Sequence, residues 1–399
     1  MKQCPVGPET SRVLQQGHPW VIADRYTHRW PQVAAGELVV LVDQERRPLG
    51  VGICDPANRI VARRLPGEPT TIDSDWLEVQ FRQCLELRKL ALLGNTDCYR
   101  LVNGEGDGLP GVTVDRYADY LMLQLYTDAW QPYLDQLVAG LKRVFQPAGI
   151  YLKYRPQQTR KLEAQKKSRQ MNLLLAGDRA PNPLSVRENE LVYRVNLHHG
   201  LHTGLFPDQR CNRLEMMQRV AGMRVLNLFA FTGAFSAAAA VAGAEQVTSI
   251  DVSEKYLAIA RENFADNLID PHQHQFVAGD VFTELAKMRS QGRTFDCILF
   301  DPPSFSTTKK SRFSTRGGTA DLVAETLPLL SPGGLLISSS NHQKVTLDEY
   351  FKELRRGALK AAQHLRVIHV GGQPEDFPCD IGFTEGRYLK FVICVKGIS

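Results

Sequence analysis

The sequence contains no long hydrophobic run. Its longest stretch of small apolar residues extends from Ala237 to Ala244, whereas a membrane-spanning helix needs about 20 apolar residues. The first ten residues, MKQCPVGPET, also lack the apolar core of a signal peptide. We therefore expect a cytoplasmic protein that has no membrane partner.

Paired cysteines are also absent. None of the eight cysteines belongs to a Cys-x-x-Cys pair, and none has a histidine at the spacing of metal ligands. This pattern predicts neither a disulfide framework nor a zinc site. We therefore expect reduced thiols and no bound metal.

A strong charge of either sign is missing too. Lysine and arginine number 48 against 43 aspartates and glutamates, which leaves a net charge of +5. Hydrophobic residues make up 43% and charged residues 23%, as in globular proteins, and this excludes a disordered or fibrous chain. A charge of +5 permits a polyanionic partner without requiring one, so the distribution of the basic residues matters more than their number.

The chain length of 399 residues suggests two or three domains at about 150 residues each. Residues 1–70 are rich in short β-type runs separated by turn-forming residues, and we interpret them as a small β-barrel. These runs cover residues 37–43, 49–53 and 59–63. Almost no helical periodicity is visible in this part of the chain.

Residues 71–180 mix helical and extended patterns, and we interpret them as a compact α+β domain. Apolar residues near a 3.6-residue period predict a helix over 73–93, with Asp73 as its N-cap. A second helix is expected over 131–145. Strands are expected over 120–126 and 149–154.

Residues 181–399 alternate strands with helices, which predicts parallel pairing and a doubly wound α/β sheet of the Rossmann type. The expected strands cover residues 224–229, 246–251, 273–277, 295–300 and 334–340. The expected helices between them cover residues 234–243, 254–267 and 320–330.

Ligands of such sheets bind beyond the carboxyl ends of the strands. The turn after the first strand holds Asn227, Phe229, Thr232 and Gly233, and Gly233 gives the backbone the freedom to enter the next helix. Asp251 ends the second strand, 18 positions after Gly233, where an acid can accept hydrogen bonds from ribose hydroxyls. A solvated helix cap is its alternative role. The motif Gly-x-Gly-x-x-Gly is absent, which argues against a dinucleotide.

Two further strand ends carry candidate residues. Asp280 follows the third strand, where its carboxylate suits an adenine amino group. The fourth strand ends in Asp301-Pro302-Pro303-Ser304-Phe305. The two prolines restrain the backbone and direct the Asp301 carboxylate toward a pocket, and Phe305 can stack on a base that has left its helix. This segment favours methyl transfer to a nucleobase, with a plain proline turn as the alternative.

These motifs carry a family resemblance. Residues 200–345 resemble class I S-adenosylmethionine-dependent methyltransferases, and the whole chain resembles the bacterial large-subunit ribosomal RNA methyltransferases with an N-terminal PUA domain, the RlmI-like cytosine-C5 group. Gly17-His-Pro-Trp20, the segment 100–117 and Gly204-Leu-Phe-Pro-Asp-Gln-Arg210 contribute to the match. The resemblance implies S-adenosylmethionine as the cofactor, held near Asn227, Phe229, Thr232, Gly233, Asp251, Asp280 and Asp301. It also implies ribosomal RNA as the partner and a role for Arg210 in orienting the active site.

One position departs from the RlmI-like pattern. Cytosine C5 is not nucleophilic, so enzymes of that group attack C6 with a cysteine thiolate. Their cysteine follows the fifth strand, and an alignment through Val345 places Asn341 there. Cys211 and Cys379 stay open as substitutes for the missing thiol.

Asn341 and the Ser- and Lys-rich stretch after Asp301 also resemble the RlmK-type guanine-N7 methyltransferases, whose target atom needs positioning but no covalent catalyst. An amide can both donate to and accept from a base edge. We therefore expect Asp301, Pro302, Phe305 and Asn341 to form the base pocket, and we prefer a ring-nitrogen target such as guanine N7. An Asn341 without a role is the alternative.

Basic residues cluster in two places despite the small net charge. The candidates for RNA phosphate contacts are Lys161, Lys166 and Lys167 in one cluster and Lys309, Lys310 and Arg312 in the other. A solvated charge run is the alternative for each cluster. A catalytically inactive cofactor- and RNA-binding module and a small-molecule methyltransferase are the rival functions, and a homodimer stays open.

Overall fold

The computed structural model describes residues 1–91, 93–154, 172–200, 202–303, 305–307, 312–314 and 318–397. Contacts divide the chain into two compact units. The first unit comprises Met1–Leu184, Asn196–Thr203 and Glu375–Gly386. The second comprises Ser185–Val195, Gly204–Pro374 and Arg387–Ser399. In the described part of the chain, no helix combines the length and the apolar character that crossing a membrane requires.

The first unit begins with a five-stranded sheet of order β1-β3-β4-β5-β2. Its strands are β1 (Lys2–Pro5), β2 (Trp20–Ile22), β3 (Leu38–Val42), β4 (Pro48–Cys54) and β5 (Ile60–Arg64), with η1 at Thr27–Arg29. The three expected strands are confirmed to within one or two residues. Helix α1 (Pro8–Gln15) was not expected, because eight residues are too few for a clear helical period. Pro8 at its first position favours the helix start.

The second sheet of this unit has the order β10-β9-β8-β7-β6 and packs against two helices. Its strands are β6 (Cys98–Asn103), β7 (Val112–Tyr117), β8 (Tyr120–Leu125), β9 (Gly149–Tyr154) and β10 (Asn172–Gly177). The helical segments are α2 (Ser74–Lys89), α3 (Leu134–Phe145), η2 (Gly104–Asp107) and η3 (Asp128–Tyr133). As predicted, Asp73 caps α2, where its side chain accepts a hydrogen bond of 2.8 Å from the backbone N–H of Trp76.

One hydrophobic cluster of the first unit contains buried residues from both of its sheets. Leu38 and Ile53 of the first sheet belong to the same buried cluster as Leu101 and Trp130 of the α+β part. Burial of one such side chain contributes about 1.5–3 kcal/mol, so this cluster joins the two parts firmly. The expected boundary between residues 70 and 71 lies within this unit, and the division into three domains stays a prediction.

The second unit is built on a seven-stranded sheet of order β15-β14-β13-β16-β19-β21-β20. Its strands are β13 (Arg224–Leu228), β14 (Gln246–Asp251), β15 (Gln275–Ala278), β16 (Phe295–Phe300), β19 (Leu330–Ser340), β20 (Leu365–Gly371) and β21 (Lys390–Lys396). Strands β13 to β19 pair in parallel, and β21 is antiparallel to both of its neighbours. The predicted doubly wound α/β fold is confirmed.

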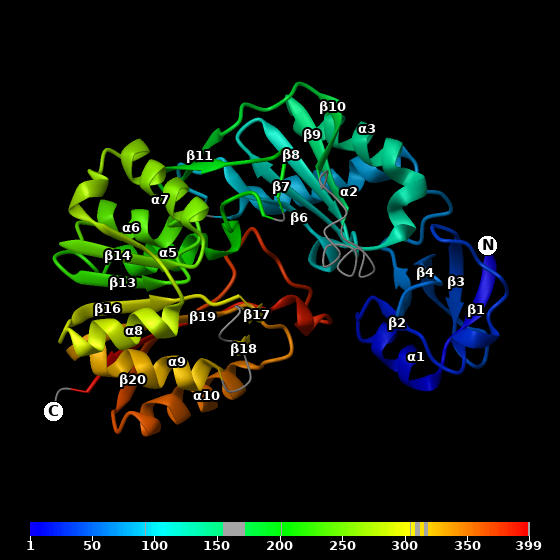
Figure 1. Cartoon of the computed structure of the whole chain (residues 1–399). Helices are drawn as coiled ribbons and strands as arrows, with labels where there is room; N and C mark the ends of the chain where they lie inside the picture. The colour runs from blue at the N-terminus through cyan, green and yellow to red at the C-terminus, as the bar shows by residue number, and fades with distance from the viewer. Residues whose placement is uncertain are drawn as a thin grey trace. The chain divides into compact units, whose positions relative to one another are not determined.

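Helices cover both faces of this sheet, with α5, α6 and α7 on one face and α8, α9 and α10 on the other (Figure 1). They are α5 (Arg210–Met217), α6 (Ala234–Val241), α7 (Glu254–Asp266), α8 (Val281–Ser290), α9 (Gly318–Thr326) and α10 (Leu347–Lys360). The other elements are β11 (Leu184–Glu188), β12 (Leu191–Val195), β17 (Phe305–Thr307), β18 (Arg312–Ser314), η4 (Pro207–Gln209), η5 (Pro271–Gln273), η6 (Leu327–Leu329) and η7 (Thr384–Gly386). Helices α8 and α10 were not expected.

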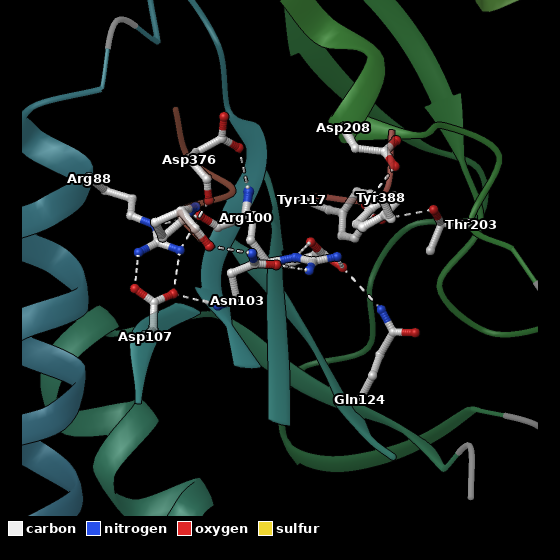
Figure 2. A network of polar contacts seen from close by, with 12 residues as sticks. Arg88, Arg100, Asn103, Asp107, Tyr117, Gln124, Thr203, Asp208, Asp376 and Tyr388 are labelled. Carbon is white, nitrogen blue, oxygen red and sulfur yellow. Dashed lines mark hydrogen bonds and ion pairs between the residues drawn. The ribbon is translucent and has the colours of Figure 1, made fainter. Parts of the chain in front are cut away.

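The segment Glu375–Gly386 lies between β20 and β21 in sequence, yet it belongs to the first unit. A buried polar network holds it there (Figure 2). Arg88 forms a bidentate ion pair with Asp107, with both N···O distances 2.6 Å, and also donates to the Asp376 carbonyl at 3.0 Å. The Asp376 carboxylate accepts from the backbone N–H of Arg100 at 2.9 Å. The segment is therefore anchored by charged side chains that are out of contact with solvent.

Candidate active site

A pocket opens at the carboxyl ends of β13 and β16, where the strand order of the second unit's sheet reverses. The empty space inside it, counted together with the open solvent at its mouth, is about 450 Å³. It is lined by Gly204, Phe206, Gln209, Arg213, Asn227, Phe229, Ala230, Phe231, Ala234, Phe235 and Asp301. Pockets of doubly wound sheets are expected at this switch point.

The loop after β13 forms one wall, and its backbone is held in an uncommon shape. Phe229 and Phe231 adopt the left-handed region, with φ of 59° and 52°. Asp251 stabilises this loop because its carboxylate accepts hydrogen bonds of 2.9 Å from the backbone N–H groups of Phe231 and Ser253. The acid expected to bind ribose therefore also ties the loop after β13 to the turn after β14.

Thr232 and Gly233 continue this loop without lining the pocket. The Thr232 hydroxyl donates to the carbonyl of Gly204 at 2.5 Å. Gly233 has φ of 73°, and a Cβ added there would lie 2.6 Å from the Cβ of Ala260 on α7. Both its backbone shape and the close approach of α7 therefore require glycine.

Two more of the expected cofactor residues lie on strand ends. Asn227 lines the pocket and donates to the Ser236 hydroxyl at 2.9 Å. Asp280 is the N-cap of α8, where it accepts from the backbone N–H and the hydroxyl of Thr283 at 3.1 Å. Its expected contact with adenine stays a prediction, as do the cofactor contacts of the other residues.

Asp301 follows β16, lines the pocket and is only partly exposed. Its Oδ2 accepts a hydrogen bond of 2.9 Å from the Gln209 side chain. Burial raises the pKa of Asp301 to about 6; the negative charge of Asp208 adds to this shift, whereas hydrogen bonds from Ser339 and Gln209 oppose it. Pro302, the next residue, is buried. A carboxyl group that lines a pocket and whose pKa is raised toward neutral pH is typical of a functional site.

Asn341 follows β19, the strand next to β16. In the parallel register Phe300 faces Ser338, so the ends of the two strands lie at the same edge of the sheet. Asn341 is exposed. Lys390 holds this strand end, because its Nζ donates to the carbonyl oxygen of His342 at 2.7 Å. Burial lowers the pKa of Lys390 to about 8.

Helix α5 and the residues just before it contribute side chains that the sequence did not single out. Arg213 lines the pocket, whereas Arg210 is buried at the start of α5 and does not belong to the lining residues. Gln209 lines the pocket and contacts Asp301. The Gly204–Arg210 motif marked this segment, but only the structure shows which of its side chains reach the pocket.

A family model described as S-adenosylmethionine-dependent methyltransferase matches residues 99–387, and a PUA-like domain model matches residues 6–66. The chain belongs to the S-adenosylmethionine-dependent methyltransferases. Proteins named ribosomal RNA large subunit methyltransferase I from Shigella flexneri and Cronobacter sakazakii are 33% identical over 386 residues, 96% of this chain and 96% of theirs. The resemblance seen in the sequence is thereby confirmed.

Solved structures agree with this assignment. A methyltransferase complexed with S-adenosylhomocysteine superposes with a TM-score of 0.89 at 29% identity, over 99% of this chain and 100% of that chain. A methyltransferase from Streptococcus mutans gives a TM-score of 0.87 at the same identity and coverage. The cofactor of this methyltransferase is S-adenosylmethionine, as expected.

The pocket suits that cofactor. S-adenosylmethionine combines an adenosine, an amino acid and a positively charged sulfur that carries the methyl group to be transferred. The aromatic rings of Phe206, Phe231 and Phe235 are among the lining residues and offer apolar surface to an adenosine. Asp301 is the one acidic residue among the lining residues, and its carboxylate suits a cationic ligand. The residues present therefore fit the cofactor.

The cysteine thiols of this methyltransferase differ in burial and therefore in how readily they could act as nucleophiles. Burial raises the pKa of Cys297 to about 12 and that of Cys394 to about 11, so neither is a thiolate at neutral pH. The Cys379 thiol lies in the first unit, where it donates to the Phe383 carbonyl at 2.9 Å. Cys211 lies on α5 and is partly exposed.

Most of the residues that we expect to contact RNA are not among the described residues. These are Lys161, Lys166, Lys167, Lys309 and Lys310. The backbones of Phe305 and Arg312 belong to β17 and β18, which pair antiparallel.

In the described ranges, no cluster of three or more His, Cys, Asp and Glu residues has the arrangement of a metal site.

Proposed function

We propose that this methyltransferase transfers the methyl group of S-adenosylmethionine to a base of large-subunit ribosomal RNA. The observation that carries the proposal is the match to proteins named for this reaction along 96% of both chains. It includes the PUA-like domain as well as the cofactor fold. A methyltransferase for small molecules would need only the second part.

The chain's own residues would bind and orient the base. The Asp301 carboxylate can accept a hydrogen bond from an N–H group of a flipped base, and Pro302 restrains the backbone that carries it. The Asn341 amide, at the same edge of the sheet, can donate to or accept from a base edge. A base placed between these strand ends would lie beside the cofactor pocket.

The absence of a thiol at position 341 supports a ring-nitrogen acceptor. Methylation of cytosine C5 requires a thiolate that adds to the ring, whereas a ring nitrogen offers its own lone pair. Asn341 stands where the RlmI-like group has its cysteine, and the thiols of Cys297 and Cys394 are held protonated by burial. We therefore favour a ring nitrogen, such as guanine N7, as the acceptor.

The RNA backbone would be held by basic side chains. We propose phosphate contacts for Lys161, Lys166, Lys167, Lys309, Lys310 and Arg312. Such contacts release counterions, so binding should weaken steeply as the salt concentration rises.

The test is a transfer assay with radiolabelled S-adenosylmethionine and large-subunit ribosomal RNA that lacks base methylation, offered both naked and in subunits. Mass spectrometry of the digested RNA identifies the product. A methylated base in wild-type protein, and its loss in Asp301→Ala, is expected. Cofactor binding without transfer to any RNA would contradict the function, and 5-methylcytosine would contradict the nitrogen target and make Cys211→Ala and Cys379→Ala the next variants.

A further inference from the structure

The Gln209 side chain is buried beneath the candidate active site, and its hydrogen bonds define its orientation. Its Oε1 accepts from the Asn212 Nδ2 at 2.7 Å. Its Nε2 donates both to Asp301 Oδ2 at 2.9 Å and to the Ser339 hydroxyl oxygen at 2.8 Å. The Asn212 amide N–H can only donate and the Asp301 carboxylate can only accept, so a flipped amide would lose both of these hydrogen bonds.

The side chain that orients Gln209 is itself held in place. Asn212 is buried on α5. Its Oδ1 lies so close to Gly371, the last residue of β20, that a Cβ added there would come within 2.5 Å. Glycine at this strand end therefore leaves the space that Asn212 occupies.

Asp208, the residue before Gln209, gives the short helix η4 a second anchor. The Tyr388 hydroxyl donates to Asp208 Oδ2 at 2.7 Å (Figure 2). Asp208 and Gln209 are consecutive residues of η4. The helix that carries Gln209 is thus attached to the chain that enters β21 as well as to the ends of β16 and β19.

We propose that Gln209 is a positioning residue for methyl transfer, which orients the Asp301 carboxylate toward the base. This inference rests on the proposed function. By occupying Oδ2, the amide leaves Oδ1 as the oxygen that meets the substrate. By bridging Asp301 and Ser339, it also ties the ends of β16 and β19 together, and Asn341 follows the second of these strands.

The amide has an electrostatic effect as well. A hydrogen bond donated to a carboxylate favours its ionised form, and Gln209 and Ser339 both act in this sense on Asp301. Removal of the amide should therefore raise the pKa of Asp301 further above its ordinary value. A merely structural glutamine would change stability without changing this pKa.

The first test compares Gln209→Leu with wild-type protein in the transfer assay over a range of pH. Loss of a hydrogen bond to a charged group should lower kcat by about 10- to 100-fold, and the acidic limb of the pH profile should move to higher pH. Asn212→Ala, which frees the amide to rotate, should produce the same shift with a smaller loss. Gln218→Leu is the matched control, because Gln218 is exposed at the C-terminal end of α5, the helix that follows Gln209.

The second test does not depend on activity. Calorimetry gives the affinities for S-adenosylmethionine, which carries a positive charge on sulfur, and for S-adenosylhomocysteine, which does not. Because Asp301 lines the pocket, its ionisation should favour the charged ligand, so the ratio of the two affinities should rise with pH. The midpoint of this rise should lie at higher pH in Gln209→Leu than in wild type or Gln218→Leu.

The outcomes separate the two proposals. If the rise of the affinity ratio has the wild-type midpoint in both Gln209→Leu and Asn212→Ala, the role of Gln209 is overturned. This holds even if these variants lose activity because they are less stable. Wild-type protein that transfers no methyl group to RNA would overturn the proposed function, whereas the affinity ratio would still decide whether Gln209 controls Asp301. A shifted midpoint with normal melting temperature supports the positioning role.

Discussion

The guanidinium of Arg213 forms a bidentate ion pair with the carboxylate of Glu188, with both N···O distances 2.6 Å. Both side chains are almost completely buried. Arg213 also donates to the Phe206 carbonyl at 2.8 Å, so the pair joins β11, α5 and the loop that lines the cofactor pocket. Its contribution is to hold the pocket wall in shape as well as to neutralise a buried charge.

We expect Glu188→Ala to lower the free energy of unfolding by about 3–5 kcal/mol, because it leaves the Arg213 charge buried without its partner. Cofactor affinity should fall as well, since Phe206 loses its support. Urea denaturation and calorimetry measure the two effects. The control is Glu9→Ala, which removes an exposed pair with Arg12 and should change neither quantity measurably. Equal behaviour of the two variants would contradict the prediction.

A second prediction concerns the anchor of the segment Glu375–Gly386. Arg88→Met should lower the free energy of unfolding by about 3–5 kcal/mol, because the Asp107 carboxylate stays buried without its cation. The segment should also become more accessible, so limited proteolysis should cleave it faster. Arg82→Met, on the same helix but at an exposed pair with Glu78, is the matched control. Cleavage of the segment at the wild-type rate in Arg88→Met would show that the anchor lies elsewhere.

The ionisation of Asp301 predicts a pH dependence of activity. Because burial raises its pKa to about 6, the carboxylate is protonated below that pH and no longer accepts a hydrogen bond from the base. Methyl transfer should therefore fall below about pH 6 in wild-type protein. Asp301→Asn should retain little activity and show no acidic limb near this pH. An acidic limb that persists unchanged in this variant would assign it to another group.

The raised pKa of Asp301 also predicts that stability, unlike activity, decreases as the pH rises. The folded pKa of about 6 lies above the ordinary value of 3.8, so the unfolded chain releases this proton first. Relative to Asp301→Asn, wild-type protein should therefore lose stability as the pH rises from about 4 to 6, by about 1–3 kcal/mol, and stay constant above. Urea denaturation of both proteins over this range measures it. A pH-independent difference between the two would refute the raised pKa.

Gly233 provides a prediction for the loop after β13. Gly233→Ala must adopt a positive φ and places its Cβ 2.6 Å from that of Ala260. Left-handed strain costs about 1–2 kcal/mol and overpacking about 1–3 kcal/mol more, and cofactor affinity should fall with the displaced loop. Gly243 has a φ of +85°, and a Cβ added there would have its nearest neighbour at 4.0 Å. Gly243→Ala should therefore lower the free energy of unfolding by the cost of the left-handed backbone alone. Denaturation and calorimetry compare the two variants.

The sequence predicts the central sheet well because short β-branched or apolar runs alternate with helical segments, as in a parallel sheet. The strands at Gln246–Asp251 and Phe295–Phe300 match their predicted bounds. Helix α10 was missed although Thr346 and Glu349 form a capping box, a local signal that could have found it. Strands β6 and β7 were not expected either.

The site was predictable where it depends on strand ends and not where it depends on distant contacts. Asp301 and Asn227 follow from their place near the ends of the first and fourth predicted strands of the sheet, and both line the pocket. Gln209 contacts Asp301 across 92 positions in sequence, and no local pattern reports such a distance. The place of Glu375–Gly386 in the first unit was unpredictable in the same way, because the contact that anchors this segment joins Arg88 to a carbonyl 288 positions away.

This recruitment affects how the protein is made. The first unit combines Met1–Leu184 with Glu375–Gly386, so the ribosome must synthesise the chain through Gly386 before that unit has all its parts. The chain passes between the two units five times. Neither unit can therefore be obtained whole by cutting the gene at a single point, and the two cannot be exchanged separately between relatives by simple recombination.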